Sequence, residues 1–309
     1  MSAEQSPAPP SAQNEITDFR DLAFKVSDEQ LEQLIERYTR DVTKYARLGK
    51  FDPVIGRERE VEELITILMQ RGRSNAVLLG PAGAGKTALF VALAQAIVAD
   101  KVPKMLKNSR VIEMELSTFA AGTTTRGEFE GRLIPFFKGT AERNASKKFP
   151  PMILCIDELH TIMPTCHATA ASGMSDIMKP YLTAGDLQII GATTRDEFNQ
   201  FVRPDAAMER RFQKVIVEEP SIEATIHILK TLKPKYEKHF EIKISDEICE
   251  RIVRVATKYL RKQNNPDKSI ITLDQACAFA TKAEHKELTW DSVAETIGSQ
   301  IGVVGSAIE

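Results

Sequence analysis

A glycine-rich segment at residues 80–87, GPAGAGKT, matches the phosphate-binding pattern G-x-x-x-x-G-K-[ST]. An apolar run precedes it and a helix-forming run follows it, so a chance glycine-rich turn is the weaker interpretation. Its backbone N–H groups and the next helix N-terminus can bind phosphate oxygens, Lys86 can reach the β and γ phosphates, and Thr87 can ligate Mg²⁺. The segment therefore predicts an ATP and Mg²⁺ site. Its loop residues are expected to be Gly80, Pro81, Ala82, Gly83, Ala84, Gly85, Lys86, Thr87 and Ala88.

Two adjacent carboxylates, Asp157 and Glu158, follow an apolar run at residues 152–156. Neighbouring side chains at a strand end point to different faces, so the two can do different work. We expect Asp157 to hold Mg²⁺ and Glu158 to act as the base that meets the attacking water. Alone, the pair would read as a solvated acidic turn. Together with the phosphate loop it indicates ATP hydrolysis, and His160 beside it is expected to be structural because Glu158 fills the base role.

Polar residues at two further places could complete such a site. Thr193 ends the apolar run 187–192, and ligands of open parallel sheets lie at the carboxyl ends of strands. Arg210 and Arg211 follow. They could be a surface salt-bridge pair or could neutralise charge in the transition state, and spacing alone leaves both interpretations open.

The hydrophobic pattern predicts an α/β fold. Short apolar runs at 76–79, 110–116, 152–156, 186–192 and 214–217 alternate with helical patterns, among them 87–98 and 129–142, where Pro135 is expected to bend or split the helix. Such runs are typical of a parallel sheet covered on both faces. Beyond Pro220 the pattern is helical, at about 221–240, 245–260, 268–286 and 289–299. We expect a disordered tail at 1–15, a helical lead-in at 16–50 capped at Ser27, an α/β nucleotide-binding domain at 51–219 and a helical domain at 220–309.

Composition narrows the classes of partner. The 309 residues carry 41 Lys and Arg against 43 Asp and Glu, a formal net charge of −2. We therefore expect neither nucleic acid nor a membrane surface as a partner. The longest apolar stretch, 88–99, is too short to span a bilayer, and no secretory signal pattern opens the sequence. Four cysteines without a C-x-x-C spacing indicate reduced thiols in the cytoplasm, with the nucleus as the other option.

Seven motifs occur in an order that resembles the first ATPase domain of Clp-type unfoldases and disaggregases, the ClpA and ClpB type of AAA+ protein. They are DPVIGR (52–57), the phosphate loop (80–87), RGEFE (126–130), IDELH (156–160), GATT (191–194), ERRFQ (209–213) and PDK (266–268). The resemblance covers about residues 40–300. It implies a five-stranded parallel sheet sandwiched by helices, followed by a small all-helical lid. It leaves open whether the sequence is complete or is the first half of a protein with two ATPase domains.

The resemblance also implies roles for particular residues. It implies a hexameric ring, either a homo-oligomer or an assembly with a related ATPase, with ATP at the subunit interfaces. Thr193 resembles the sensor of the fourth strand, and Arg210 and Arg211 resemble fingers that enter the neighbouring subunit's site. The residues that resemble adenine contacts are Val54 and Ile55 on one side and Ile226 and Pro266 on the lid side.

One position departs from the family pattern. The family grips substrate polypeptide with a pore-loop tyrosine just before the RGEFE motif, and this sequence has Thr125 there, with Thr124 in place of a usual lysine. Hydroxyl side chains offer far less apolar area to an extended chain than an aromatic ring does. The main hypothesis is a Clp-type ATPase that remodels protein. The alternative is an ATP-binding regulatory or adaptor subunit that does not thread substrate, and a DNA-remodelling ATPase is disfavoured by the balanced charge.

Overall fold

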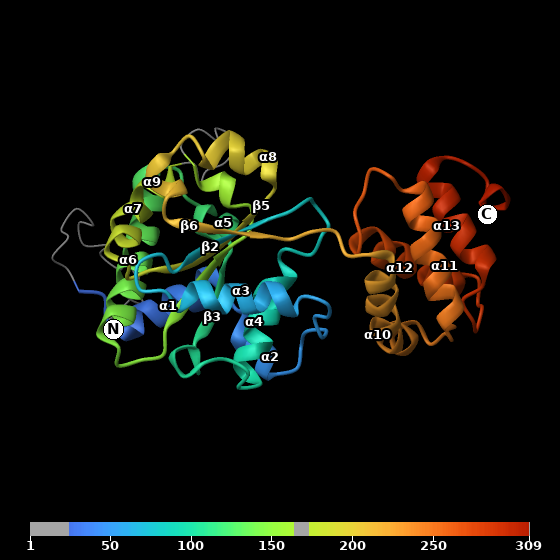
Figure 1. Ribbon diagram of the computed structural model, residues 1–309, viewed down its shortest axis with the longest axis horizontal. Coiled ribbons are helices and arrows are strands. Elements are labelled where there is room, and N and C mark those ends of the chain that lie inside the picture. The colour runs from blue at the N-terminus through green and yellow to red at the C-terminus, as the bar shows by residue number, and fades with distance from the viewer. Residues whose placement is uncertain (1–24, 164–172, 309) are drawn as a thin grey trace, which may run out of the picture.

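The computed structural model describes residues 25–163 and 173–308. The tail expected at 1–15 and Cys166 lie outside the described residues. An α/β domain is followed by a separate group of four helices, to which the segment after the last strand leads (Figure 1). The described part of the chain thus has the two-part organisation that the sequence predicts.

The α/β domain is built on a six-stranded sheet with the order β1-β3-β4-β5-β2-β6. Five strands are parallel, and β1 is antiparallel to β3. The strands are β1 Thr39–Asp41, β2 Asn75–Leu79, β3 Arg110–Met114, β4 Met152–Ile156, β5 Gln188–Thr193 and β6 Phe212–Ile216. The five parallel strands confirm the predicted fold class. The sixth was not expected, because a three-residue strand at the edge carries no apolar run to reveal it.

Helices cover both faces of the sheet, and each face has its own core. In β2, Val77 and Leu79 pack on one side, whereas Ala76 and Leu78 pack on the other. Helices α1, α6 and α7 contribute to the first core and α2, α3 and α4 to the second (Figure 1). The helices of this domain are α1 Asp28–Tyr38, α2 Val42–Arg47, α3 Glu58–Leu68, α4 Ala88–Val98, α5 Leu116–Ala120, α6 Arg126–Ser146, α7 Met174–Ala184, α8 Arg195–Glu197 and α9 Ala206–Glu209.

Helix α6 runs without a break from Arg126 to Ser146, so Pro135 does not split it, and the bend that was the other expectation stays a prediction. A proline inside a helix removes one backbone hydrogen bond. The turns on both sides of Pro135 are held by buried apolar side chains, Leu133 before it and Phe136 and Phe137 after it. This packing outweighs the loss of one bond.

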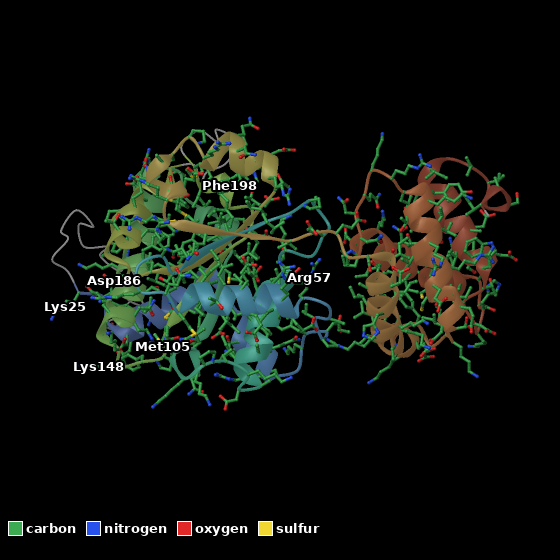
Figure 2. The ribbon with its side chains drawn as sticks, in the orientation of Figure 1. Lys25, Arg57, Met105, Lys148, Asp186 and Phe198 are labelled. Atoms are coloured by element: carbon green, nitrogen blue, oxygen red, sulfur yellow. The ribbon has the colours of Figure 1, made fainter. Side chains whose placement is uncertain are left out.

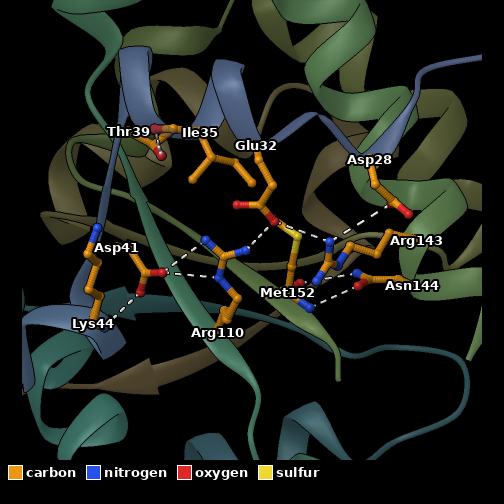
Figure 3. Close-up of polar contacts among 10 residues, drawn as sticks. All are labelled: Asp28, Glu32, Ile35, Thr39, Asp41, Lys44, Arg110, Arg143, Asn144 and Met152. Atoms are coloured by element: carbon orange, nitrogen blue, oxygen red, sulfur yellow. Dashed lines mark hydrogen bonds and ion pairs between the residues drawn. The ribbon is translucent and has the colours of Figure 1, made fainter. Parts of the chain in front are cut away.

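The lead-in before the first long strand is fastened to the sheet edge by charged contacts. The predicted N-cap is confirmed, since Ser27 Oγ accepts from Gln30 N at 3.1 Å. Arg110 of β3 lies between Glu32 of α1, at 2.6 Å, and Asp41 of β1, at 3.0 Å (Figure 3). Arg143 of α6 also reaches Glu32, at 3.2 Å. The lead-in is therefore part of the α/β domain and closes the open side of β3.

The second domain is a bundle of four helices with its own core. Residues from all four helices contribute to one buried cluster. The helices are α10 Ile222–Phe240, α11 Asp246–Tyr259, α12 Asp267–Lys282 and α13 Trp290–Ile301. Each begins and ends within a few residues of the predicted bounds, because the 3.6-residue period of their apolar positions is strong.

Candidate nucleotide-binding site

The phosphate loop joins β2 to α4 in a backbone conformation that requires glycine. Gly83 and Gly85 have φ values of 77° and 89°, in the left-handed region that side chains disfavour. At Gly80, a Cβ atom would lie 2.1 Å from the carbonyl oxygen of Val217. The sequence spacing of these glycines therefore has a steric reason at each position.

Lys86 turns its amine back onto the loop. Its Nζ donates to the carbonyl oxygens of Gly80 and Pro81, both at 3.0 Å. Burial lowers the pKa of Lys86, and the carboxylates of Asp157, Glu197 and Glu158 offset this only in part. An ammonium held by neutral carbonyls would gain stronger, charge-assisted hydrogen bonds from phosphate oxygens.

The hydroxyl of Thr87 and the carboxylate of Asp157 meet directly. Thr87 Oγ1 donates to Asp157 Oδ2 at 2.7 Å, across the gap between α4 and the end of β4. The other oxygen of Asp157 accepts from Glu158 N at 2.9 Å. Glu158 has a left-handed backbone, with φ 50°, and starts the turn that leads into the short helix Leu159–Ile162. Asp157 therefore faces Thr87, and the division of work between the two carboxylates stays a prediction.

These groups line a cleft of about 480 Å³ between the α/β domain and the first turn of α12. Asn264 Nδ2 donates to Ala82 O at 2.9 Å, and the Asp267 N–H points to Gly83 O at 3.4 Å, so the helical domain covers the loop. The lining residues are Ala82, Gly83, Gly85, Lys86, Thr87, Ala88, Asp157, Glu158, Thr193, Thr194, Glu197, Pro266, Asp267 and Ile270. Most of the predicted loop, both carboxylates, Thr193 and Pro266 are thus brought together.

Three expected adenine contacts are not among the residues that line this cleft. Ile226 is 8% exposed and packs in the core of the helical domain. Val54 donates its N–H to Gln95 Oε1 at 3.3 Å, and Ile55 follows it. Their role as adenine contacts stays a prediction.

Arg210 and Arg211 also lie away from the cleft. They line a separate hollow of about 150 Å³ with Lys179 and Leu182. Arg210 donates Nε to Ala206 O at 2.9 Å, and neither arginine makes an ion pair within the described part of the chain. The surface salt-bridge interpretation is therefore not supported by this structure.

Two residues near the cleft received no role from the sequence. Arg57 is buried on the side of the α/β domain that faces the helices (Figure 2). It donates to Ala84 O at 2.6 Å and to Glu218 O at 2.9 Å, which ties the phosphate loop to the segment leading out of β6. Glu197 enters the cleft from α8, three residues after Thr194. The T-x-x-E spacing of a capping box was the signal that could have located it.

The fold and the site together define a P-loop ATPase with a helical lid. Comparison with protein families gives two matches, the "ATPase family associated with various cellular activities (AAA)" over residues 76–219 and the AAA lid domain over 221–300. Chaperone protein ClpB 1 of Nostoc sp. is 42% identical over 258 residues, which are 82% of this chain and 29% of ClpB 1. The ATP-binding subunit ClpC of the Clp protease from Staphylococcus aureus is 43% identical over 251 residues, 81% of this chain and 30% of ClpC.

Solved structures give the same result. The Hsp104–casein complex of S. cerevisiae matches with a TM-score of 0.77 and 37% identity, over 87% of this chain and 45% of that one. The Hsp104–ADP complex matches with a TM-score of 0.78 and 35% identity, over 89% and 46%. This chain belongs to the Clp-type AAA+ ATPases. It spans about 30% of the length of the curated relatives it matches. Among the described residues, no helix is both long and apolar enough to cross a membrane.

Proposed function

We propose that the chain hydrolyses Mg²⁺-bound ATP in this cleft and uses the energy for Clp-type protein remodelling. The observation that carries the proposal is the 2.7 Å hydrogen bond between Thr87 and Asp157, with Glu158 in the same cleft. A hydroxyl and a carboxylate this close can both reach one ion, and Mg²⁺ prefers oxygen ligands that include phosphates and water. Thr87 and Asp157 would hold the ion, which supplies charge neutralisation on the phosphates.

The remaining roles are proposed from position in the cleft and, for Val54, Ile55 and Ile226, from the family resemblance. Lys86 would exchange its carbonyl contacts for the β and γ phosphates. Glu158 would accept the proton of the attacking water, and Thr193 would contact that water or the γ-phosphate. Val54, Ile55, Ile226 and Pro266 would enclose adenine after a small movement of the lid.

Arg210 and Arg211 would serve the site of a neighbouring subunit. Their place outside the chain's own cleft, without an ion-pair partner among the described residues, supports this assignment. An arginine that enters from a neighbour stabilises transition-state charge and makes hydrolysis depend on assembly. We therefore propose a hexameric ring, formed by this chain alone or with a related ATPase.

The proposed substrate is an unfolded polypeptide. Hsp104, a structural relative, has been solved in complex with casein. The described cysteines, Cys155, Cys249 and Cys277, are buried and unpaired, which supports a reducing compartment such as the cytoplasm. The comparisons do not favour the alternative of a regulatory or adaptor subunit. Measuring ATP turnover with and without an unfolded protein distinguishes the two functions.

The test measures ATP turnover and nucleotide binding in the purified chain with and without unfolded casein. Glu158→Gln should keep ATP binding and lower turnover by about 100-fold or more. Lys86→Ala should lose binding. Casein should raise the turnover of the unsubstituted chain. Full turnover in Glu158→Gln would refute the assignment of the base, and normal turnover that casein leaves unchanged would favour the regulatory subunit.

A further inference from the structure

Thr193, the proposed sensor, forms a hydrogen-bonded unit with two polar side chains, His160 and Glu197, to which the proposed function gives no role. His160 Nδ1 lies 3.0 Å from Thr193 Oγ1, and Thr193 Oγ1 lies 3.0 Å from Glu197 Oε2. His160 Nδ1 is also 3.3 Å from Glu197 Oε2. The three residues come from the turn after β4, the end of β5 and α8. They therefore join the segments that carry the base and the sensor.

The number of protons in this unit fixes the direction of each hydrogen bond. Burial alone would raise the pKa of Glu197, but hydrogen bonds from Thr194 and Thr193 hold that pKa below its usual value, so its carboxylate is ionised and only accepts. The single hydroxyl proton of Thr193 therefore points to Glu197. The contact between Thr193 and His160 then needs a proton from the ring, which must lie on Nδ1.

This arrangement has a consequence for the sensor threonine. The Thr193 hydroxyl donates its proton to Glu197 and accepts a hydrogen bond from His160 with one lone pair. Its second lone pair is free, so any further hydrogen bond to this oxygen must be one that it accepts. Thr193 is 2% exposed and cannot easily rearrange these bonds. A fixed acceptor in this place suits a water molecule that loses its proton to Glu158, and does not suit a phosphate oxygen, which also accepts.

The same unit holds the turn that carries the base. Glu158 O accepts from Thr161 N at 2.9 Å, which places His160 inside that turn. Leu159 packs on the backbone of β5 so closely that a Cβ at Gly191 would lie 2.6 Å from it. The ring of His160 stacks on Phe201, with centroids 5.7 Å apart. The turn is thus fixed to β5 at two successive residues.

We propose that His160 and Glu197 are positioning residues that fix Thr193 as a hydrogen-bond acceptor for the attacking water. They also hold the turn that carries Glu158 at a fixed position relative to Thr193. The proposal rests on ATP hydrolysis in this cleft and goes beyond it, because it assigns positioning roles to two residues that act through the sensor.

A kinetic test uses the coupling between His160 and Thr193. His160→Leu keeps an apolar contact with Phe201 but loses the N–H donor, and we expect kcat to fall about tenfold to a hundredfold with little change in KM for ATP. His160→Asn can present an N–H near the position of Nδ1 and should regain most of kcat. In a Thr193→Val background, His160→Leu should change kcat by less than about twofold, because its partner is already lost. His285→Leu, at an exposed histidine in the lid, is the control.

A purely structural role for His160 predicts the opposite order, with Leu better tolerated than Asn, and equal effects in both backgrounds. Either result would overturn the proposal. A second measurement does not depend on turnover. In ¹⁵N-histidine-labelled protein at pH 8, the His160 signal, assigned by its loss in His160→Leu, should show a proton on Nδ1. A proton on Nε2 would overturn the hydrogen-bond unit. A chain without ATP turnover would refute the proposed function, and with it the kinetic role, while the ring proton would still report on the hydrogen bonds.

Discussion

At the scale of residues, the proposed binding of a metal-bound nucleotide depends on individual side-chain groups. The hydroxyl of Thr87 is the simplest of these groups to remove. Thr87→Val keeps the size of the side chain but deletes the donor that lies 2.7 Å from Asp157. We expect turnover to be lost at low Mg²⁺ and to recover only in part at high Mg²⁺, because one ligand of the ion is missing. Thr87→Ser restores the hydroxyl and is the matched control. The measurement is ATP turnover across a Mg²⁺ titration, and equal curves for Val and Ser would exclude Thr87 as a ligand.

Much of the site could be predicted at this scale because its residues are contiguous in the sequence. The loop at 80–87 and the pair Asp157 and Glu158 are short motifs whose spacing reflects backbone geometry. Arg57 could not be found in this way, because its partners are the backbone carbonyl oxygens of Ala84 and Glu218. Every residue has such a carbonyl, so the residue types in the sequence do not indicate these contacts. The proton order between His160, Thr193 and Glu197 likewise exists only once three segments meet.

At the scale of elements, the start of α6 explains what Thr125 does in place of a pore tyrosine. Thr125 Oγ1 accepts from Glu128 N at 3.3 Å, and Glu128 Oε2 accepts from Thr125 N at 3.4 Å, which together form a capping box. The hydroxyl therefore begins the helix and is turned toward the helix backbone. The substitution found here has a structural use of its own.

This use gives a prediction for the pore position. Thr125→Tyr should lower the free energy of unfolding by about 1 kcal/mol, because tyrosine cannot cap the helix, and Thr125→Ser should leave it nearly unchanged. Urea unfolding of the three proteins measures the difference. If Tyr and Ser have the same stability, the hydroxyl is not an effective cap. A gain in casein-stimulated turnover in Thr125→Tyr, despite the lower stability, would show that gripping had been limited by this residue.

The attachment of the lead-in could not be predicted, because it depends on pairing between distant segments. Strand β1 has only three residues, which is too short to give a sequence pattern. Arg110 contacts Glu32 and Asp41 only once the chain has folded, because the three residues lie far apart in the sequence (Figure 3). Arg110→Leu would leave two carboxylates close together at the edge of the sheet. We expect it to cost about 1–2 kcal/mol, less than for a fully buried pair because Glu32 is 41% exposed. Urea unfolding checks this value, and Arg40→Leu, at a more exposed arginine on β1, is the control, expected to cost less than about 1 kcal/mol. Equal losses would mean that the Arg110 contacts add nothing specific.

At the scale of the whole molecule, the two-domain arrangement was predictable and the relation between the domains was not. The alternation of apolar runs and helical periods gave the boundary near Pro220. The contacts of Asn264 and Asp267 with the phosphate loop join parts of the chain that are far apart in sequence, so no local pattern reports them. They join the lid directly to the loop that is proposed to hold the phosphates.

An active site shared between subunits can be tested by mixing two inactive variants. Glu158→Gln lacks the proposed base but keeps both arginines, whereas the double variant Arg210→Ala, Arg211→Ala keeps Glu158 but lacks the arginines. If the arginines act in a neighbour's site, each variant alone should be at least about a hundredfold slower than the original chain. A mixture should regain turnover, because an intact cleft then meets intact arginines at some interfaces.

The measurement is turnover against mixing ratio at several protein concentrations, with Arg203→Ala as an exposed control nearby. A mixture no faster than the sum of its parts, at concentrations where assembly is seen by light scattering, would place the two arginines outside the catalytic machinery. Recovery that grows with concentration would mean that the ring, and not the single chain, is the unit that hydrolyses ATP.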